Sequence, residues 1–393
     1  MAATPPPPQP VEPAAPKPPA LVFRAPALLA PGVAIELSGQ GAGARRRIQV
    51  QVKLDGGWRD LAGIRADARG RYARAIEPET VRGGYRLRAL APDGRRSREL
   101  VVRTRPVTLA AVGDVNLGDA TAGVMAAQGL NYPWSSVAPS LRKADVAFAN
   151  LECAISTRGA PVEKQYRFRG SPAALKAMRA YAGIDVVNLA NNHVGDYGTT
   201  ALLDTIDWSR RLGLVPVGAG GSLSAAMEPR VVERLGLKIA FVGFSSILPP
   251  EFWATPTHPG NTFASAANVR ASVSAARRVA DVVVATFHWG IELDPVENPQ
   301  ESALAATALA SGADAVIGGH PHVLQPIRTS AGGRKVVAYS LGNFVFASHR
   351  AETVRTGILH LDLSARGVER TRFQRATIEG VRPVLTGSWV DVR

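Results

Sequence analysis

The stretch that decides the fold runs from Ile184 to Gly198 and reads I-D-V-V-N-L-A-N-N-H-V-G-D-Y-G. Its first half is apolar and partly β-branched, which predicts a buried strand. The strand pattern breaks at Asn191-Asn192-His193, and Gly195 then bends the backbone. The stretch therefore places an amide and an imidazole at the end of a strand. An isolated pair of this kind would mean only a turn residue beside a satisfied histidine.

Five further apolar runs pass into polar residues in the same way. Each ends in a short segment that contains an amide, a carboxylate or an imidazole. These segments are Gly113-Asp114-Val115-Asn116, Asn150-Leu151-Glu152, His288-Trp289-Gly290, Gly318-Gly319-His320-Pro321-His322 and Ser340-Leu341-Gly342-Asn343. Functional groups of an open α/β sheet gather outside the carboxyl ends of its strands, so we expect the six segments to share one rim.

The side chains of this rim predict a metal site. Neutral imidazoles and hard oxygen ligands suit borderline divalent ions such as Mn, Fe or Zn, and a carboxylate can bridge two of them. In extended backbone, residues i and i+2 face the same way, so His320 and His322 could each serve one metal. The set is typical of a two-metal hydrolase, and neither a Ser-His-Asp pattern nor a Gly-rich phosphate loop competes with it.

Between the strand patterns lie helical ones, over residues 173–182, 199–212, 266–280 and 300–310. Ser171-Pro172 provides an N-cap and a first-turn proline for the first of them, and Gly183 and Gly213 close the first two. Alternation of strand and helix predicts the α/β class.

The order of the six motifs resembles that of the CapA-type capsule synthesis proteins, a family associated with poly-γ-glutamate and similar to calcineurin-like metallophosphoesterases. The resemblance covers about Val107 to Phe346. It implies a metallophosphoesterase-like four-layer αββα sandwich, which we place in residues 106–393.

The resemblance also implies a ligand set for one or two Mn, Fe or Zn ions. The ligands are Asp114 and His322 on the first metal, Asn192, His288 and His320 on the second, and Glu152 as the bridge. Many metallophosphoesterases have a histidine two residues after the first aspartate, where this chain has Asn116. An amide oxygen is a weaker ligand, so the sequence leaves Asn116 open as a ligand or a plain loop residue.

By the same resemblance, His193 would not bind metal but would donate a proton to the leaving group, a role suited to an imidazole of near-neutral pKa. Asp196, three residues on, either orients His193 or caps the following helix. Substrate contacts are expected from Lys164, Arg169, Asn150 and Asn343. Lys164 or Arg169 would hold a carboxylate or phosphate, and the alternative is a solvated basic strand.

The N-terminal part of the chain has a different composition. Residues 1–20 contain nine prolines, which predicts a disordered or polyproline II spacer. Residues 21–105 show short alternating runs separated by turns, which predicts a small all-β sandwich of the immunoglobulin type.

We expect neither a membrane-spanning run nor an intact signal peptide in the chain as given. The resemblance implies an exported, extracytoplasmic protein whose signal or anchor is absent from this chain.

Most of the excess positive charge lies in the predicted sandwich. Residues 21–105 hold 18 Lys/Arg and 8 Asp/Glu, which is +10 of the chain's net +14. The alternatives are a solvated basic face and a binding surface for an anionic partner, namely poly-γ-glutamate, wall polymer or a membrane surface. Nucleic acid is not expected, because no aromatic side chains are interleaved with the arginines.

Cys153 is the only cysteine, which excludes an intramolecular disulfide, and we expect it to be a small buried residue rather than a nucleophile.

The hypothesis from the whole sequence is a CapA-type protein of poly-γ-glutamate, capsule or related envelope polymer synthesis, with a dinuclear hydrolase-like site and polymer or synthase subunits as partners. Two alternatives stay open. One is a metal-dependent phosphoesterase with an unrelated substrate, and the other is a non-catalytic assembly or export factor with a structural metal.

Overall fold

The structure is a computed structural model that describes residues 18–77 and 84–392. It divides into two compact units, one formed by residues up to Leu28 with Ala34–Thr104 and the other by Leu29–Val33 with Arg105–Arg393. Most of the proline-rich tract lies outside the described residues. Among the residues that are described, no helix has the length and apolar character needed to cross a bilayer.

The first unit consists of strands in two small sheets. One has the order β1 (Val22–Arg24), β3 (Ile35–Gln40), β6 (Tyr72–Ile76), and the other has the order β2 (Leu28–Leu29), β8 (Leu100–Thr104), β7 (Tyr85–Leu90), β4 (Arg47–Leu54), β5 (Gly57–Arg65). Buried and exposed residues alternate along β7, as expected for a sheet with one face on a core. The immunoglobulin-like assignment of this unit stays a prediction.

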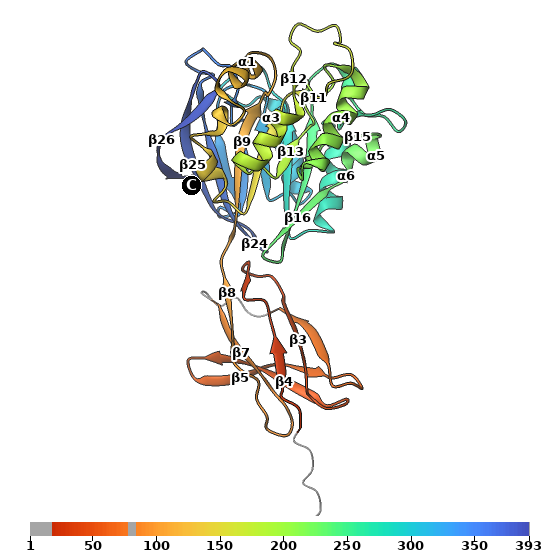
Figure 1. The fold of residues 1–393 in the computed structure, drawn as a ribbon, viewed down its shortest axis with the longest axis vertical. Helices are drawn as coiled ribbons and strands as arrows, with labels where there is room; N and C mark the ends of the chain where they lie inside the picture. The colour runs from red at the N-terminus through yellow and green to blue at the C-terminus, as the bar shows by residue number, and fades with distance from the viewer. Residues whose placement is uncertain (1–17, 78–83, 393) are drawn as a thin grey trace, which may run out of the picture. The chain divides into compact units, whose positions relative to one another are not determined.

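The second unit is built on two larger sheets (Figure 1). The eight-stranded sheet has the order β14 (Val215–Val217), β13 (Val186–Asn188), β10 (Val146–Leu151), β9 (Val107–Val115), β24 (Arg355–Ser364), β25 (Gly367–Glu379), β26 (Arg382–Asp391), with β23 (Asn343–Val345) also paired to β9. The six-stranded sheet has the order β16 (Arg230–Arg234), β17 (Leu237–Ser245), β19 (Val282–His288), β20 (Ala315–Gly319), β22 (Lys335–Ala338), β21 (Ile327–Ser330).

Three apolar cores hold these sheets and their helices in four layers. One core lies between the sheets and joins, for example, Phe148 of β10 to Phe241 of β17. A second packs the other face of the eight-stranded sheet against α1 (Asp119–Gln128), α2 (Ala138–Leu141), α3 (Pro172–Ala177) and α4 (Gly198–Arg211). A third packs the six-stranded sheet against α6 (Ala266–Arg277) and α7 (Pro299–Ala310). The α/β class predicted from the sequence is confirmed.

The helix signals in the sequence mark real boundaries. Ser171 accepts a hydrogen bond from the Ala174 N–H at the start of α3. The predicted helix over 173–182 continues from α3 into a π-helical segment, Met178–Ala182, and ends at Gly183, whose φ of 83° is left-handed. The remaining elements are short: β11 (Ala154–Ile155) with β12 (Arg169–Gly170), β15 (Ala219–Gly220) with β18 (Gly260–Asn261), helix α5 (Leu223–Met227), and the 3-10 turns η1 (Tyr132–Trp134) and η3 (Pro250–Phe252).

Candidate metal centre

Parallel pairing brings the polar segments to one end of each sheet. In the eight-stranded sheet, Asp114 of β9 is in register with Asn150 of β10 and Asn343 of β23. In the six-stranded sheet, His288 of β19 is in register with Gly319 of β20. Because the sheets pack face to face, the two strand ends meet, and the resulting cluster is the candidate metal centre.

Glu152 lies at the middle of this centre. Its Oε1 is 3.3 Å from His288 Nε2, 3.9 Å from His322 Nε2 and 3.9 Å from His193 Nε2. The potential ligand atoms of Glu152, His320 and His322 lie within 4.8 Å of one another, and so do those of Asp114, Glu152 and His288. Glu152 is the one residue that the two groups share, and its bridging role stays a prediction.

The side chains in the centre fit a divalent cation. Glu152 is fully buried, and neither of its carboxylate oxygens has a hydrogen-bond partner among the described residues. His320 Nδ1 is likewise buried and without a partner in that part of the chain. Unpaired buried polar atoms are costly, and a buried carboxylate needs a compensating positive charge. The mixed nitrogen and oxygen donors suit Mn, Fe or Zn.

The charges of the carboxylates dominate the electrostatics of the centre. Burial alone would raise the pKa of Glu152, but the neighbouring His322 and His288 imidazoles lower it below its usual range. Burial would lower the pKa of His322, yet Glu152 and Asp114 raise it to about 10. His320 shows the opposite balance, since burial and the adjacent His288 hold its pKa well below the usual value. Glu152 and Asp114 thus attract positive charge to this point.

The close fit around Asp114 depends on a residue without a side chain. A Cβ added at Gly319 would lie 2.3 Å from Asp114 Oδ1. Asp114 Oδ2 accepts the His320 N–H at 3.0 Å, and Asn150 Nδ2 donates to Oδ1 at 2.8 Å. The carboxylate is therefore held between two strands, in contact with the loop that carries His320.

The expectation that His320 and His322 lie in extended backbone is wrong. Both have positive φ values, 97° at His320 and 59° at His322. Such backbone is strained for residues with a Cβ and clusters at functional sites. Both rings still turn toward the centre, with centroids 5.9 Å apart, because the tight loop replaces the two-residue alternation of a strand.

Asn192 and Asn116 differ in their surroundings. Asn192 Oδ1 lies 2.9 Å from His288 Nε2, so this amide oxygen borders the centre as expected of a ligand. Asn116 Oδ1 instead accepts the Gly118 N–H at 2.8 Å. That local turn favours the loop role, one of the two that the sequence left open for Asn116.

His193 is held by three groups. Its Nδ1 lies 2.6 Å from Asp196 Oδ2 and 3.2 Å from Lys164 Nζ, and its ring stacks on Phe168 with centroids 4.1 Å apart. Asp196 also accepts the Phe168 N–H at 2.7 Å and the Lys164 ammonium at 2.9 Å. With Nδ1 directed at Asp196, Nε2 is the atom that faces Glu152. No side-chain cap is present at α4, so the alternative role of Asp196 as a helix cap is wrong.

Three of the four residues expected to contact substrate are committed to other contacts. Lys164 binds Asp196 and the Asn192 carbonyl, while Asn150 bonds Asp114 and accepts from Asn188 Nδ2 at 2.9 Å. Arg169 is exposed, and its guanidinium lies over the Tyr197 ring at 4.1 Å. These side chains hold the centre or pack beside it.

Asn343, the fourth, joins the centre to an open pocket. Its Oδ1 accepts from His322 Nδ1 at 2.8 Å, which directs His322 Nε2 toward Glu152. The pocket measures about 360 Å³. Besides His193, His322 and Asn343, its walls include Tyr166, Phe168, Glu292, Phe346, His349 and Arg350. His349 and Arg350 were not recognised from the sequence, because they follow the last motif in a loop without a pattern of its own.

Two further features concern residues near the centre. Asn188 and Asn191 both donate to Asn150 Oδ1, which forms a buried amide network under the carboxylates. The signal for it was present in the sequence, as the spacing Asn188, Asn191, Asn192.

Cys153 is buried and free, so the expectation of a buried residue is confirmed. Burial raises the pKa of its thiol to about 12, which disfavours the nucleophilic thiolate.

Comparison with known proteins gives consistent matches. The family described as "Bacterial capsule synthesis protein PGA_cap" matches residues 108–348. "Capsule biosynthesis protein CapA" of Bacillus anthracis is 30% identical over 72% of this chain and 68% of its own length. "PGA biosynthesis protein CapA" of Bacillus subtilis (strain 168) is 32% identical over 69% of this chain and 72% of its own length. A "Probable polyglutamine synthesis accessory protein" of Mycobacterium tuberculosis is 30% identical over 54% of this chain and 59% of its own length.

Proposed function

This chain belongs to the family of bacterial capsule synthesis proteins described as PGA_cap, and from that premise we propose that it acts in synthesis of an anionic envelope polymer such as poly-γ-glutamate through a two-metal hydrolase-like centre. The proposal includes a metallophosphoesterase-like fold for the second unit and a place outside the cytoplasmic membrane. The four layers of helices and sheets and the capsule-associated relatives support it.

One observation carries the hydrolase part of the proposal. Glu152 is a fully buried carboxylate whose two oxygens have no hydrogen-bond partner among the described residues, and it faces imidazoles from three different loops. A centre shaped only by packing would have satisfied these oxygens or replaced them with apolar atoms. The arrangement is instead that of a cation site built from both sheets.

The ligands of the proposed site are the carboxylates, amide and imidazoles at the strand ends: Asp114, Glu152, Asn192, His288, His320 and His322. A divalent cation bound there supplies Lewis acidity for hydrolysis of an ester or amide bond. Asn343 and Asn150 orient the ligands by their hydrogen bonds to His322 and Asp114.

His193 would deliver the proton to the leaving group. As an imidazolium, its Nδ1–H donates to Asp196, and its Nε2–H, on the side that faces Glu152, is the proton that the leaving group would receive. The Phe168 ring and the Lys164 contact with Asp196 keep the imidazole and carboxylate in place. A general acid held by an orienting carboxylate is needed for turnover but not for metal binding.

The test separates these two requirements. His193→Ala is expected to keep metal and fold and to lower hydrolysis of a generic phosphomonoester or phosphodiester by about 10²–10⁴-fold, the usual contribution of a general acid. His320→Ala is expected to lose metal as well, and His258→Ala, at an exposed histidine, serves as the matched control. Elemental analysis and steady-state rates are the measurements.

The same experiment can reverse the proposal. If wild-type protein shows no metal-dependent hydrolysis of phosphoesters or γ-glutamyl amides, and cells with His193→Ala still make polymer, the centre is structural. The protein is then an assembly factor of the polymer synthase.

We propose that the basic first unit binds the anionic polymer. Arg45, Arg46 and Arg47 are all exposed, and none has an ion pair in the described part of the chain. Unpaired surface arginines attract a polyanion without fixing its sequence or register. Poly-γ-glutamate, the polymer that the family resemblance implies, has the matching charge.

A further inference from the structure

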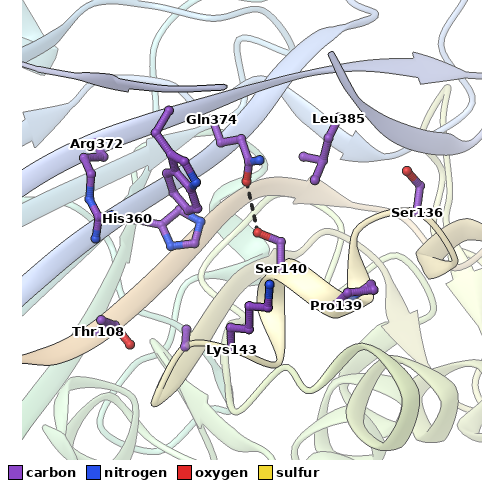
Figure 2. A pocket seen from close by; sticks show the side chains of 11 residues that line it. Thr108, Ser136, Pro139, Ser140, Lys143, His360, Arg372, Gln374 and Leu385 are labelled. Carbon is purple, nitrogen blue, oxygen red and sulfur yellow. Dashed lines mark hydrogen bonds between the residues drawn. The ribbon is translucent and has the colours of Figure 1, made fainter. Parts of the chain in front are cut away.

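A second pocket lies on the outer face of the eight-stranded sheet (Figure 2). Its volume is about 360 Å³. It is lined by side chains of β9, β24, β25 and β26 and by the segment around α2, among them Ser140, Lys143, His360, Arg372 and Trp389. None of these residues belongs to the candidate metal centre.

The pocket is well separated from the metal centre. Thr108, at the start of β9, lines the pocket, whereas Asp114, near the end of β9, lies in the centre. Six residues of strand span about 20 Å at about 3.3 Å per residue. The contents of the pocket therefore need a separate explanation.

The cationic side chains of the pocket are incompletely neutralised. Lys143 is exposed and has no ion pair with any residue that the structure describes. Arg372 donates to Asp362 Oδ1 at 2.8 Å, and its guanidinium lies over the Trp389 ring at 5.0 Å. Asp362 thus neutralises Arg372, whereas no described carboxylate pairs with Lys143, which leaves a net positive charge at the pocket wall.

Two buried nitrogen atoms of the pocket lack partners. His360 is only 5% exposed, and its Nε2 makes no hydrogen bond to a described residue. Arg372 Nε is buried and equally unpartnered within the described chain. An arginine Nε–H is always a donor, and a neutral imidazole can donate from one ring nitrogen. Such donors cost free energy unless an acceptor satisfies them.

The remaining walls suit the body of a small ligand. Trp389 is 39% exposed, and its ring meets the His360 ring edge-on with centroids 3.8 Å apart. Leu385 adds apolar surface. The Ser140 hydroxyl donates to Gln374 Oε1 at 3.0 Å, so these two polar side chains are held together in the pocket wall (Figure 2). A partly exposed indole beside cations accommodates a planar or aliphatic group attached to an anion.

We propose that this pocket is a second ligand site, which binds a small molecule or polymer end through an oxyanion, either a carboxylate or a phosphate, held by Lys143 and Arg372. The unpartnered nitrogen atoms of His360 and Arg372 donate to the same oxyanion. Trp389 and Leu385 pack against the group that carries it.

The test uses the full chain after treatment with a chelator, so that the metal centre makes no contribution. Inorganic phosphate and triglutamate are titrated separately by calorimetry at constant ionic strength. We expect saturable binding of at least one probe, and about tenfold weaker binding after Lys143→Glu, as for loss of one charge-assisted hydrogen bond. Lys176→Glu reverses another exposed lysine on the same helical layer and should leave the affinity unchanged.

The outcomes also identify the source of the oxyanion. Binding of phosphate alone assigns a phosphate ester, binding of triglutamate alone assigns a carboxylate, and binding of both shows selection by charge. The proposal is overturned if neither probe binds saturably, or if Lys143→Glu binds as tightly as Lys176→Glu and wild type.

Discussion

His322 and His360 belong to the same unit, but their surroundings carry opposite charge. At His322, burial would disfavour the proton, yet Glu152 and Asp114 raise the pKa to about 10. At His360, burial and the adjacent Arg372 lower the pKa to about 3. The comparison teaches that burial alone does not set the charge of a histidine. The charged neighbours of each histidine do, and they favour a cation in the first region and an anion in the second.

The largest expected effect tests the cation side of this comparison. Gly319→Ala places a methyl group where Asp114 Oδ1 now lies, since the added Cβ would be 2.3 Å from that oxygen. Displacing the carboxylate should weaken Mn binding by about 10²-fold, the upper range for altered support of a metal ligand. Titration of metal-free protein with Mn measures this.

The matched control is Gly123→Ala in α1, where an added Cβ meets nothing within 4 Å. It should leave Mn binding unchanged and stabilise the fold by about 0.5–1 kcal/mol, because alanine favours a helix more than glycine does. Wild-type Mn affinity in Gly319→Ala would mean that Asp114 has no part in the cation site.

A smaller effect tests the anion side through pH. The folded state binds a proton at His360 only near pH 3, whereas the unfolded state binds it near the ordinary pKa of about 6.5. Stability therefore falls as the pH decreases from about 6.5 toward about 3. Wild type should lose about 2 kcal/mol more than His360→Gln between pH 7 and pH 5. Urea denaturation at both pH values gives the difference.

Other titrating groups cancel in that difference, because both proteins carry them. The charged groups that face His360 are Arg372 and, across the pocket, Lys143. Equal losses in the two proteins would show that His360 protonates while folded, and the contrast with His322 would disappear.

The smallest expected effect sharpens the contrast. Asp362→Asn removes the carboxylate that partly neutralises Arg372 and should strengthen phosphate or triglutamate binding in the second pocket by about threefold. Asp207→Asn, which breaks the exposed ion pair with Arg211, is the control and should change nothing. Weaker binding in Asp362→Asn would mean that Asp362 positions Arg372 more than it competes for it.

The grouping of side chains at the candidate metal centre was predicted from the sequence, whereas the second pocket was not, for a physical reason. Residues at the ends of neighbouring parallel strands converge whatever the rest of the chain does, so Asp114, Glu152 and His288 could be grouped by strand pattern alone. The pocket joins Lys143, Arg372 and Trp389 through sheet order and strand register. No local sequence motif indicates the order of strands in a sheet or their register.

Within the centre, composition was easier to predict than contacts. Asn150 and Asn343 stay predicted substrate contacts, but their hydrogen bonds to Asp114 and His322 were not predicted, because these depend on register across three strands. The positive φ values at His320 and His322 were also missed, because a histidine signals such backbone far more weakly than a glycine does. Helix boundaries were predicted well where a cap is local, as at Ser171.

Cys153 has a practical consequence for labelling this protein. Thiolates rather than thiols react with maleimides, and a buried thiol with a pKa of about 12 has almost no thiolate at neutral pH. A cysteine introduced at an exposed position such as Ser135, beside the second pocket, would therefore be the single reactive thiol. One fluorophore could then be attached to the otherwise unaltered chain, and its emission would follow the filling of the pocket directly.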